Sequence, residues 1–104
     1  MRAPQEIKAA ISKSIVGNDV LLSQTQWWIP TRALEALFPL SAPQDRKMRR
    51  YSVMRYLVGK DSCKNLTESE SAALVAWAKS DKAQQEAAAI LDELGRERGQ
   101  MSLF

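Results

Sequence analysis

Residues 44–58 read QDRKMRRYSVMRYLV and decide the fold of this 104-residue chain. Large side chains recur along them at three- and four-residue spacing, as on one face of an α-helix. These side chains are Met48, Tyr51, Met54 and Val58. Gly59 follows directly and suits the left-handed conformation that ends many helices. The segment therefore predicts an amphipathic helix, against which the rest of the chain packs.

Two more helices are expected after this segment. Thr67 and Glu70 have the spacing of a capping box, in which each side chain bonds the backbone N–H of the other residue. The buried positions of this helix are predicted to be Leu66, Ala73, Leu74, Trp77 and Ala78. After a turn at Ser80-Asp81, the last helix is predicted to bury Ala83, Ala87, Ile90, Leu91 and Leu94, and to expose Gln84, Gln85, Glu86, Asp92 and Glu93. We expect Gly95 and Gly99 to fray its end.

Two helices are also expected before residue 44. The first begins at Pro4 and repeats small and apolar residues at helical spacing until Gly17-Asn18. Residues 20–22 could form a short strand or a helical turn, and the sequence leaves both open. Pro30 favours extended backbone just before it. Thr31 is then predicted to cap a short helix that carries Leu34, Leu37 and Phe38.

Trp27 and Trp28 are adjacent and cannot both face the core of an extended segment. In one interpretation, one ring lies in the core and the other is half-covered by a neighbouring element. In the other, the outer ring stacks on a nucleic-acid base or on a partner's side chain.

The fold class predicted from these segments is all-α. We expect a small single-domain helical bundle of about five helices, which fits one domain's length of chain. Residues 1–95 form the helical domain, and residues 96–104 form a flexible C-terminal tail.

Charge is unevenly distributed along the chain. Residues 41–66 hold seven basic and two acidic groups, whereas residues 67–99 hold four basic and seven acidic groups. Tyr51 and Tyr56 are interleaved with the basic residues, as in surfaces that contact phosphates and bases. The candidate nucleic-acid-binding residues are Arg46, Lys47, Arg49, Arg50, Arg55, Lys60 and Lys64. The alternative is a solvated basic face that pairs with the acidic last helix.

The residue types that most enzymes need are scarce. The chain has no histidine and one cysteine, Cys63, and it lacks a glycine-rich phosphate loop. We therefore expect no enzymatic activity, no catalytic residues, no metal site and no cofactor. A single cysteine and the absence of a long apolar stretch also favour a cytoplasmic protein that does not bind a membrane.

The last five residues carry the one motif of the chain. Gln100-Met101-Ser102-Leu103-Phe104 follows an Arg/Glu-rich segment and has two large apolar side chains at its end. It resembles the pentapeptide by which many bacterial replication and repair proteins bind the DNA polymerase sliding clamp: Gln, any residue, Ser or Asp, Leu, then Phe or Leu. The resemblance implies that Leu103 and Phe104 fill an apolar pocket and that Gln100 bonds at its rim, while Met101 is the free position.

Three functions follow as expectations. The first is a small bacterial or phage protein of DNA metabolism that binds the sliding clamp through residues 100–104. The second is a nucleic-acid-binding module that uses the basic segment at residues 46–64, and the two are compatible. The third is a structural partner protein in which Leu103 and Phe104 complete the protein's own core.

Overall fold

The structure, a computed structural model, describes residues 2–17 and 20–102, with side chains as far as Arg96. This part of the chain contains five α-helices and no strand longer than one bridged residue pair, which confirms the all-α prediction. The helices are α1 (Pro4–Ser14), α2 (Trp28–Glu35), α3 (Pro43–Val58), α4 (Glu68–Ala78) and α5 (Ala83–Ser102), with 3₁₀ turns η1 (Gln24–Gln26) and η2 (Cys63–Asn65).

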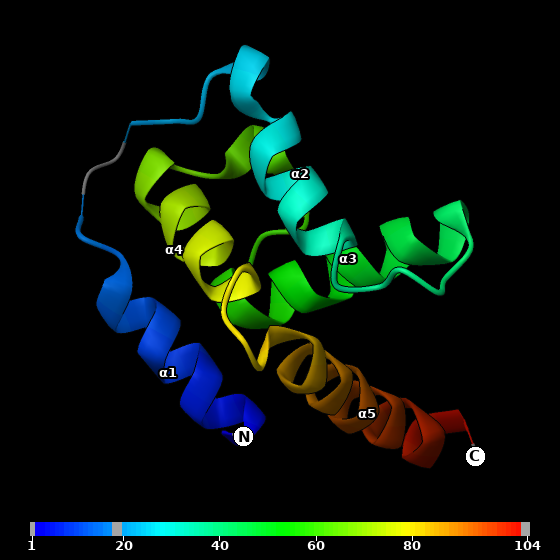
Figure 1. Ribbon diagram of the computed structural model, residues 1–104. Helices are drawn as coiled ribbons and strands as arrows, with labels where there is room; N and C mark the ends of the chain where they lie inside the picture. The colour runs from blue at the N-terminus through cyan, green and yellow to red at the C-terminus, as the bar shows by residue number, and fades with distance from the viewer. Residues whose placement is uncertain (1, 18–19, 103–104) are drawn as a thin grey trace.

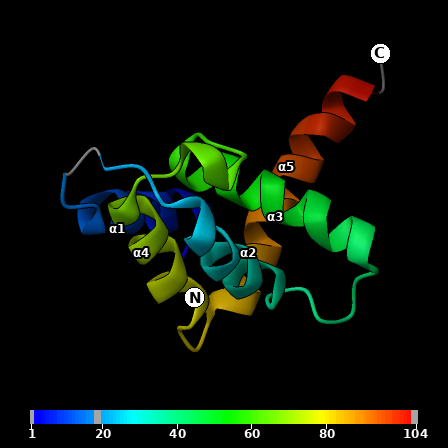
Figure 2. The same cartoon turned by 90° about the horizontal axis from the view of Figure 1, so that it is seen from above.

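One hydrophobic core holds the helices together. Helices α2 and α4 lie side by side in front of α3, and α1 and α5 pack against α3 and α4 at the other end of the bundle (Figures 1 and 2). Every helix contributes buried side chains. They include Ile7, Ile11, Leu34, Val53, Met54, Leu57, Leu74, Ala87 and Ile90. The C-terminal half of α5 runs out beyond the other helices in both views.

Helix α3 forms where the sequence predicted it, but it buries a different face. Gly59 ends it at φ 75°, so the predicted left-handed cap is confirmed. The buried side chains, however, are Arg50, Val53, Met54 and Leu57. Met48 was expected on the buried face and is 59% exposed. Helices α1, α2 and α5 all pack against α3, and their positions determine which of its side chains are buried. The periodicity of the sequence alone did not identify this face.

Helix α4 begins with the predicted capping box. The backbone N–H of Glu70 donates to Thr67 Oγ1 at 3.1 Å, and the N–H of Thr67 donates to Glu70 Oε1 at 2.9 Å. Trp77 is 5% exposed and lies in the core, as expected. These two features fix where α4 starts and which face it buries.

Helix α2 begins earlier than predicted. Trp28, Ile29 and Pro30 form its first turn, so the prediction of an extended segment there was wrong. A proline is tolerated in a first turn because the N–H at that position would have no partner within the helix. Thr31 was expected to be the N-cap, but it lies inside α2 and donates its hydroxyl to the Trp27 carbonyl at 2.8 Å.

Residues 20–22 are neither a complete strand nor a helical turn. Leu21 makes one antiparallel bridge with Thr67. The Leu22 N–H donates to the Leu66 carbonyl and the Glu68 N–H donates to the Val20 carbonyl, both at 2.8 Å. The Val20 carbonyl thus accepts from the Glu68 N–H, a first-turn donor that has no acceptor within α4.

Helix α5 differs from its prediction at two places. Glu86 was expected on the exposed face, but it is 2% exposed. Its carboxylate accepts from Trp77 Nε1 at 2.9 Å and from Arg2 Nε at 2.9 Å. The helix also continues past Gly95 to Ser102. The domain boundary predicted at residue 95 therefore falls inside α5, and the flexibility of the tail stays a prediction.

Candidate interaction surfaces

The seven basic residues singled out in the sequence do not share one surface. They lie on α3, on the loop after it and on η2. Lys47, Arg49, Arg55 and Lys64 are exposed, Arg46 and Lys60 are half-buried, and Arg50 is buried. Arg46 donates from its guanidinium to the Ser41 carbonyl at 2.8 Å. It therefore holds the turn before α3 and is less free to bind a ligand.

Arg50 belongs to the interior and does not lie on the exposed surface where the sequence placed it. Its Nε atom lies 2.8 Å from Glu35 Oε2, although the N–H is not aligned for a hydrogen bond. Its guanidinium carbon lies 4.7 Å from the centre of the Tyr51 ring, and Nη1 lies 3.9 Å from the sulfur of Cys63. A buried charge needs such partners, because it loses its hydration. Arg50 thus joins α3 to α2.

Lys60 is also engaged within the fold. Its Nζ lies 2.7 Å from Glu70 Oε1, the same oxygen that caps α4. Burial raises the pKa of Glu70, but the bonds from Lys60 and Thr67 outweigh it and leave this pKa below its ordinary value. The pair couples the loop after α3 to the first turn of α4.

The remaining exposed cations on α3 point in different directions. Lys47 and Arg49 lie on nearly opposite sides of the helix, because two residues at 100° each turn it by about 200°. Arg49 borders a hollow of about 300 Å³ next to α5, and Arg55 borders another of about 400 Å³ beside Leu94. The exposed basic residues of α3 are therefore divided between separate parts of the surface.

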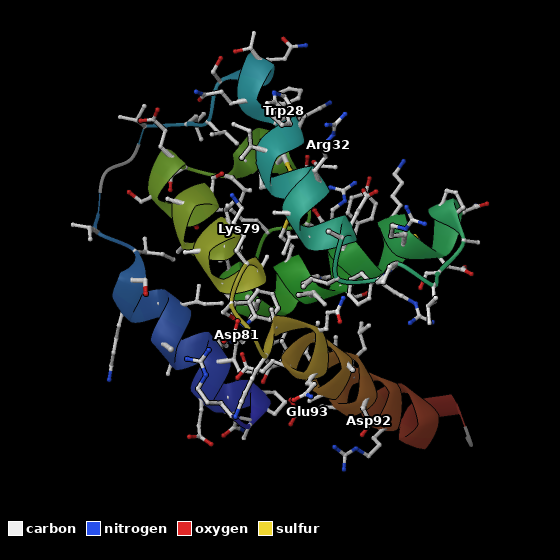
Figure 3. The ribbon with its side chains drawn as sticks, viewed as in Figure 1. Trp28, Arg32, Lys79, Asp81, Asp92 and Glu93 are labelled. Atoms are coloured by element: carbon white, nitrogen blue, oxygen red, sulfur yellow. The ribbon has the colours of Figure 1, made fainter. Side chains whose placement is uncertain are left out.

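Trp27 and Trp28 have different environments. Trp27 is half-buried, donates from Nε1 to the Leu22 carbonyl at 3.3 Å, and has Lys64 Nζ 5.9 Å from its ring centre. Trp28 is 56% exposed, and Arg32 lies 5.4 Å from its ring centre (Figure 3). The sequence prediction missed Arg32, since it placed Trp28 outside the helix. Recognition of Pro30 as a first-turn residue would have put the two side chains one turn apart.

The C-terminal motif lies at the end of α5. Leu94 is the last residue packed against the core among those whose side chains the structure describes. Gly95 and Arg96 are exposed, and the backbone of Gln100, Met101 and Ser102 is helical. Leu103 and Phe104, the two predicted anchors, lie outside the described residues. The helix thus carries residues 100–102 away from the bundle (Figure 2).

In the described part of the chain, no group of three or more His, Cys, Asp or Glu residues could hold a metal ion. None of the described helices is both long and apolar enough to span a bilayer. Comparison of the chain with protein-family models, with curated proteins and with solved structures gives no match.

Proposed function

We propose that this protein binds the bacterial DNA polymerase sliding clamp through Gln100–Phe104 and acts in the cytoplasm as an interaction module of DNA metabolism. The observation that carries the proposal is the complete motif, in which Gln100, Ser102, Leu103 and Phe104 fill every fixed position. A short peptide gains most of its affinity from a few anchors, and here Leu103 and Phe104 supply them.

The path of α5 supports this proposal. The helix leaves the core after Leu94 and extends beyond the other helices, so a clamp could reach the motif without displacing the bundle (Figures 1 and 2). Residues 95–99 separate the motif from Leu94, the last described side chain that packs against the core. Binding and folding are therefore expected to be separable, which makes the proposal testable by mutation.

The test compares the wild-type chain with a Leu103→Ala/Phe104→Ala variant. Calorimetric titration into a purified sliding clamp should give about micromolar affinity for the wild type, because the peptide must order and brings few contacts. The variant should lose binding and keep its melting temperature. Met101→Ala, at the free position, is the matched control and should bind like the wild type. Absence of wild-type binding at tens of micromolar would refute the proposal. Unfolding of the double variant would instead favour the third expectation, that the two side chains complete the core.

A second candidate function is single-stranded nucleic-acid binding, and one arrangement favours it. The exposed Trp28 ring offers a stacking surface, and Arg32 and Lys64 lie beside the paired tryptophans. Trp28→Ala should weaken binding to a single-stranded oligonucleotide, and binding should also fall steeply with salt. A wild-type chain that binds no oligonucleotide at low salt would exclude this function.

A further inference from the structure

We propose that the protein forms a two-fold symmetric dimer in which α4 packs antiparallel against α4 of a second copy. This inference does not depend on clamp binding. It starts from the outward face of α4, where no charged side chain lies between Glu68 at the start of the helix and Lys79 directly after its end. Ala72 and Ala76 are exposed and Val75 is half-buried. Glu70, the one charged residue inside α4 beyond Glu68, is turned toward Lys60.

A groove of about 500 Å³ runs along this face between α4 and α2. Leu22, Gln26 and Ile29 line one side of it, and Ala72, Val75 and Ala76 are on the other. Figure 3 shows this side of the molecule, with Lys79 at the C-terminal end of α4. An apolar helix face is normally buried, so its exposure here indicates a surface that takes a partner.

The charges at the two ends of the groove identify that partner. Glu68 lies at the start of α4 and Lys79 directly after its end, and both are exposed. Neither has an ion pair or a side-chain hydrogen bond with any residue that the structure describes. The stripe Glu68–Ala72–Val75–Lys79 has spacings of four, three and four residues, which keeps all four on one line of the helix; this is the spacing of a coiled-coil seam, here with a charge at each end.

This stripe is complementary to itself when it is reversed. An axis between Ala73 and Leu74 places Glu68 opposite Lys79 of the partner subunit and Ala72 opposite Val75 of the partner subunit. A two-fold interface needs this property, because the same patch must serve both subunits. The alanines permit a close helix approach, near the lower end of the usual range of about 8–10 Å. Half-buried Ile29, on the facing side of the groove, adds apolar area in each subunit.

Charge swapping tests the register. Glu68→Lys or Lys79→Glu alone places like charges opposite each other at two symmetric points, which should weaken dimerisation about tenfold. The double variant Glu68→Lys/Lys79→Glu exchanges the charges and should restore the wild-type dimer. Both native charges also suit the dipole of α4. If Glu68 and Lys79 acted only on the dipole of their own helix, the double variant would lose further stability and would not regain association.

The measurement is sedimentation equilibrium of the full chain over a range of concentrations, with a thermal melt of each variant to confirm folding. Lys47→Glu and Asp92→Lys, which reverse exposed charges outside the groove, are the matched controls and should leave association unchanged. Ala72→Arg should abolish it without unfolding the protein, because position 72 is exposed. A wild-type chain that is monomeric up to about 1 mM, near the weak end of measurable association, overturns the proposal. If the double variant associates no more tightly than the single variants, the antiparallel register is wrong.

Discussion

At the scale of single residues, charged side chains inside the bundle fix how its elements meet. Glu86 receives hydrogen bonds from Trp77 on the helix before it and from Arg2 near the start of the chain. The Arg2 guanidinium lowers the pKa of Glu86, which burial would raise, and the Trp77 bond adds to the lowering. Residues 84 positions apart in the sequence are thereby held together.

This pairing predicts a loss of stability in acid. A carboxyl group whose pKa is lower in the folded than in the unfolded protein stabilises the fold above its unfolded pKa, about 4.3 for glutamate. The stabilisation is lost as the pH falls through the lower, folded pKa. Glu70 has a lowered pKa too and acts in the same direction. The melting temperature should therefore decrease as the pH is lowered below about 4.3. Glu86→Gln should make this decrease with pH less steep. An identical pH dependence in the variant would show that Glu86 does not contribute.

Adjacent arginines on α3 should respond very differently to charge reversal. Arg50→Glu places a carboxylate in the core beside Glu35, and should cost about 3–5 kcal/mol of unfolding free energy, the scale for a broken buried pair. Arg49→Glu changes an exposed residue and should stay within about 0.5 kcal/mol. Urea unfolding of the two variants measures both values. Equal effects at the two positions would contradict the burial of Arg50.

At the scale of helices, two glycines should give opposite responses to alanine. Gly59 has φ 75°, so Gly59→Ala should destabilise the protein by about 1–2 kcal/mol. Gly95 lies inside α5 with no atom within 4 Å of an added Cβ, so Gly95→Ala should stabilise it by about 0.5–1 kcal/mol. Thermal melts report both, and a stabilising Gly59→Ala would exclude the left-handed cap.

The helical backbone of residues 100–102 has a consequence for clamp binding. If the motif binds in an extended form, the last turn of α5 must unwind first. Gly99 lowers that cost by about 1 kcal/mol relative to alanine. Gly99→Ala should therefore weaken clamp affinity about fivefold in a calorimetric titration. Unchanged or tighter binding would mean that the motif binds as a helix.

The elements that could be predicted from the sequence are those whose signals are local. The Gly59 cap and the Thr67–Glu70 capping box depend on a few neighbouring residues, and both are confirmed. The start of α2 was mispredicted because Pro30 permits either an extended segment or a first helical turn. Tertiary packing decided between them: Pro30 is buried and Trp27 bonds back to Leu22.

Charged residues were the harder part of the prediction, for a physical reason. The sequence placed Arg50 and Glu86 on the surface, because charges are rarely buried without partners. Their partners, Glu35 and Arg2, lie on other elements, and no periodicity reveals such pairs. Burial therefore removes Arg50 from the candidate basic surface. The C-terminal motif is recognised from five consecutive residues and needs no tertiary contact, so clamp binding stays a prediction from the sequence.

At the scale of the whole molecule, one hydrophobic core includes residues from the first helix to the last. Trp77 packs within it and also bonds Glu86, so it links the two C-terminal helices. Trp77→Ala should cost about 3–5 kcal/mol of a total that is about 5–15 kcal/mol for a domain of this size. Chemical unfolding measures the loss. A variant as stable as the wild type would place Trp77 outside the core.

The central claim is that a folded helical bundle presents a separable peptide, Gln100–Phe104, to a sliding clamp. Competition tests it most directly: fluorescently labelled full-length chain is bound to purified clamp, and a synthetic peptide covering residues 96–104 is titrated in. Complete displacement at micromolar peptide is the predicted result, since the anchors lie within the peptide. The same peptide with Leu103→Ala and Phe104→Ala should displace nothing. Failure of the native peptide to displace the chain, or clamp binding by a chain that ends at Gly99, would contradict the claim.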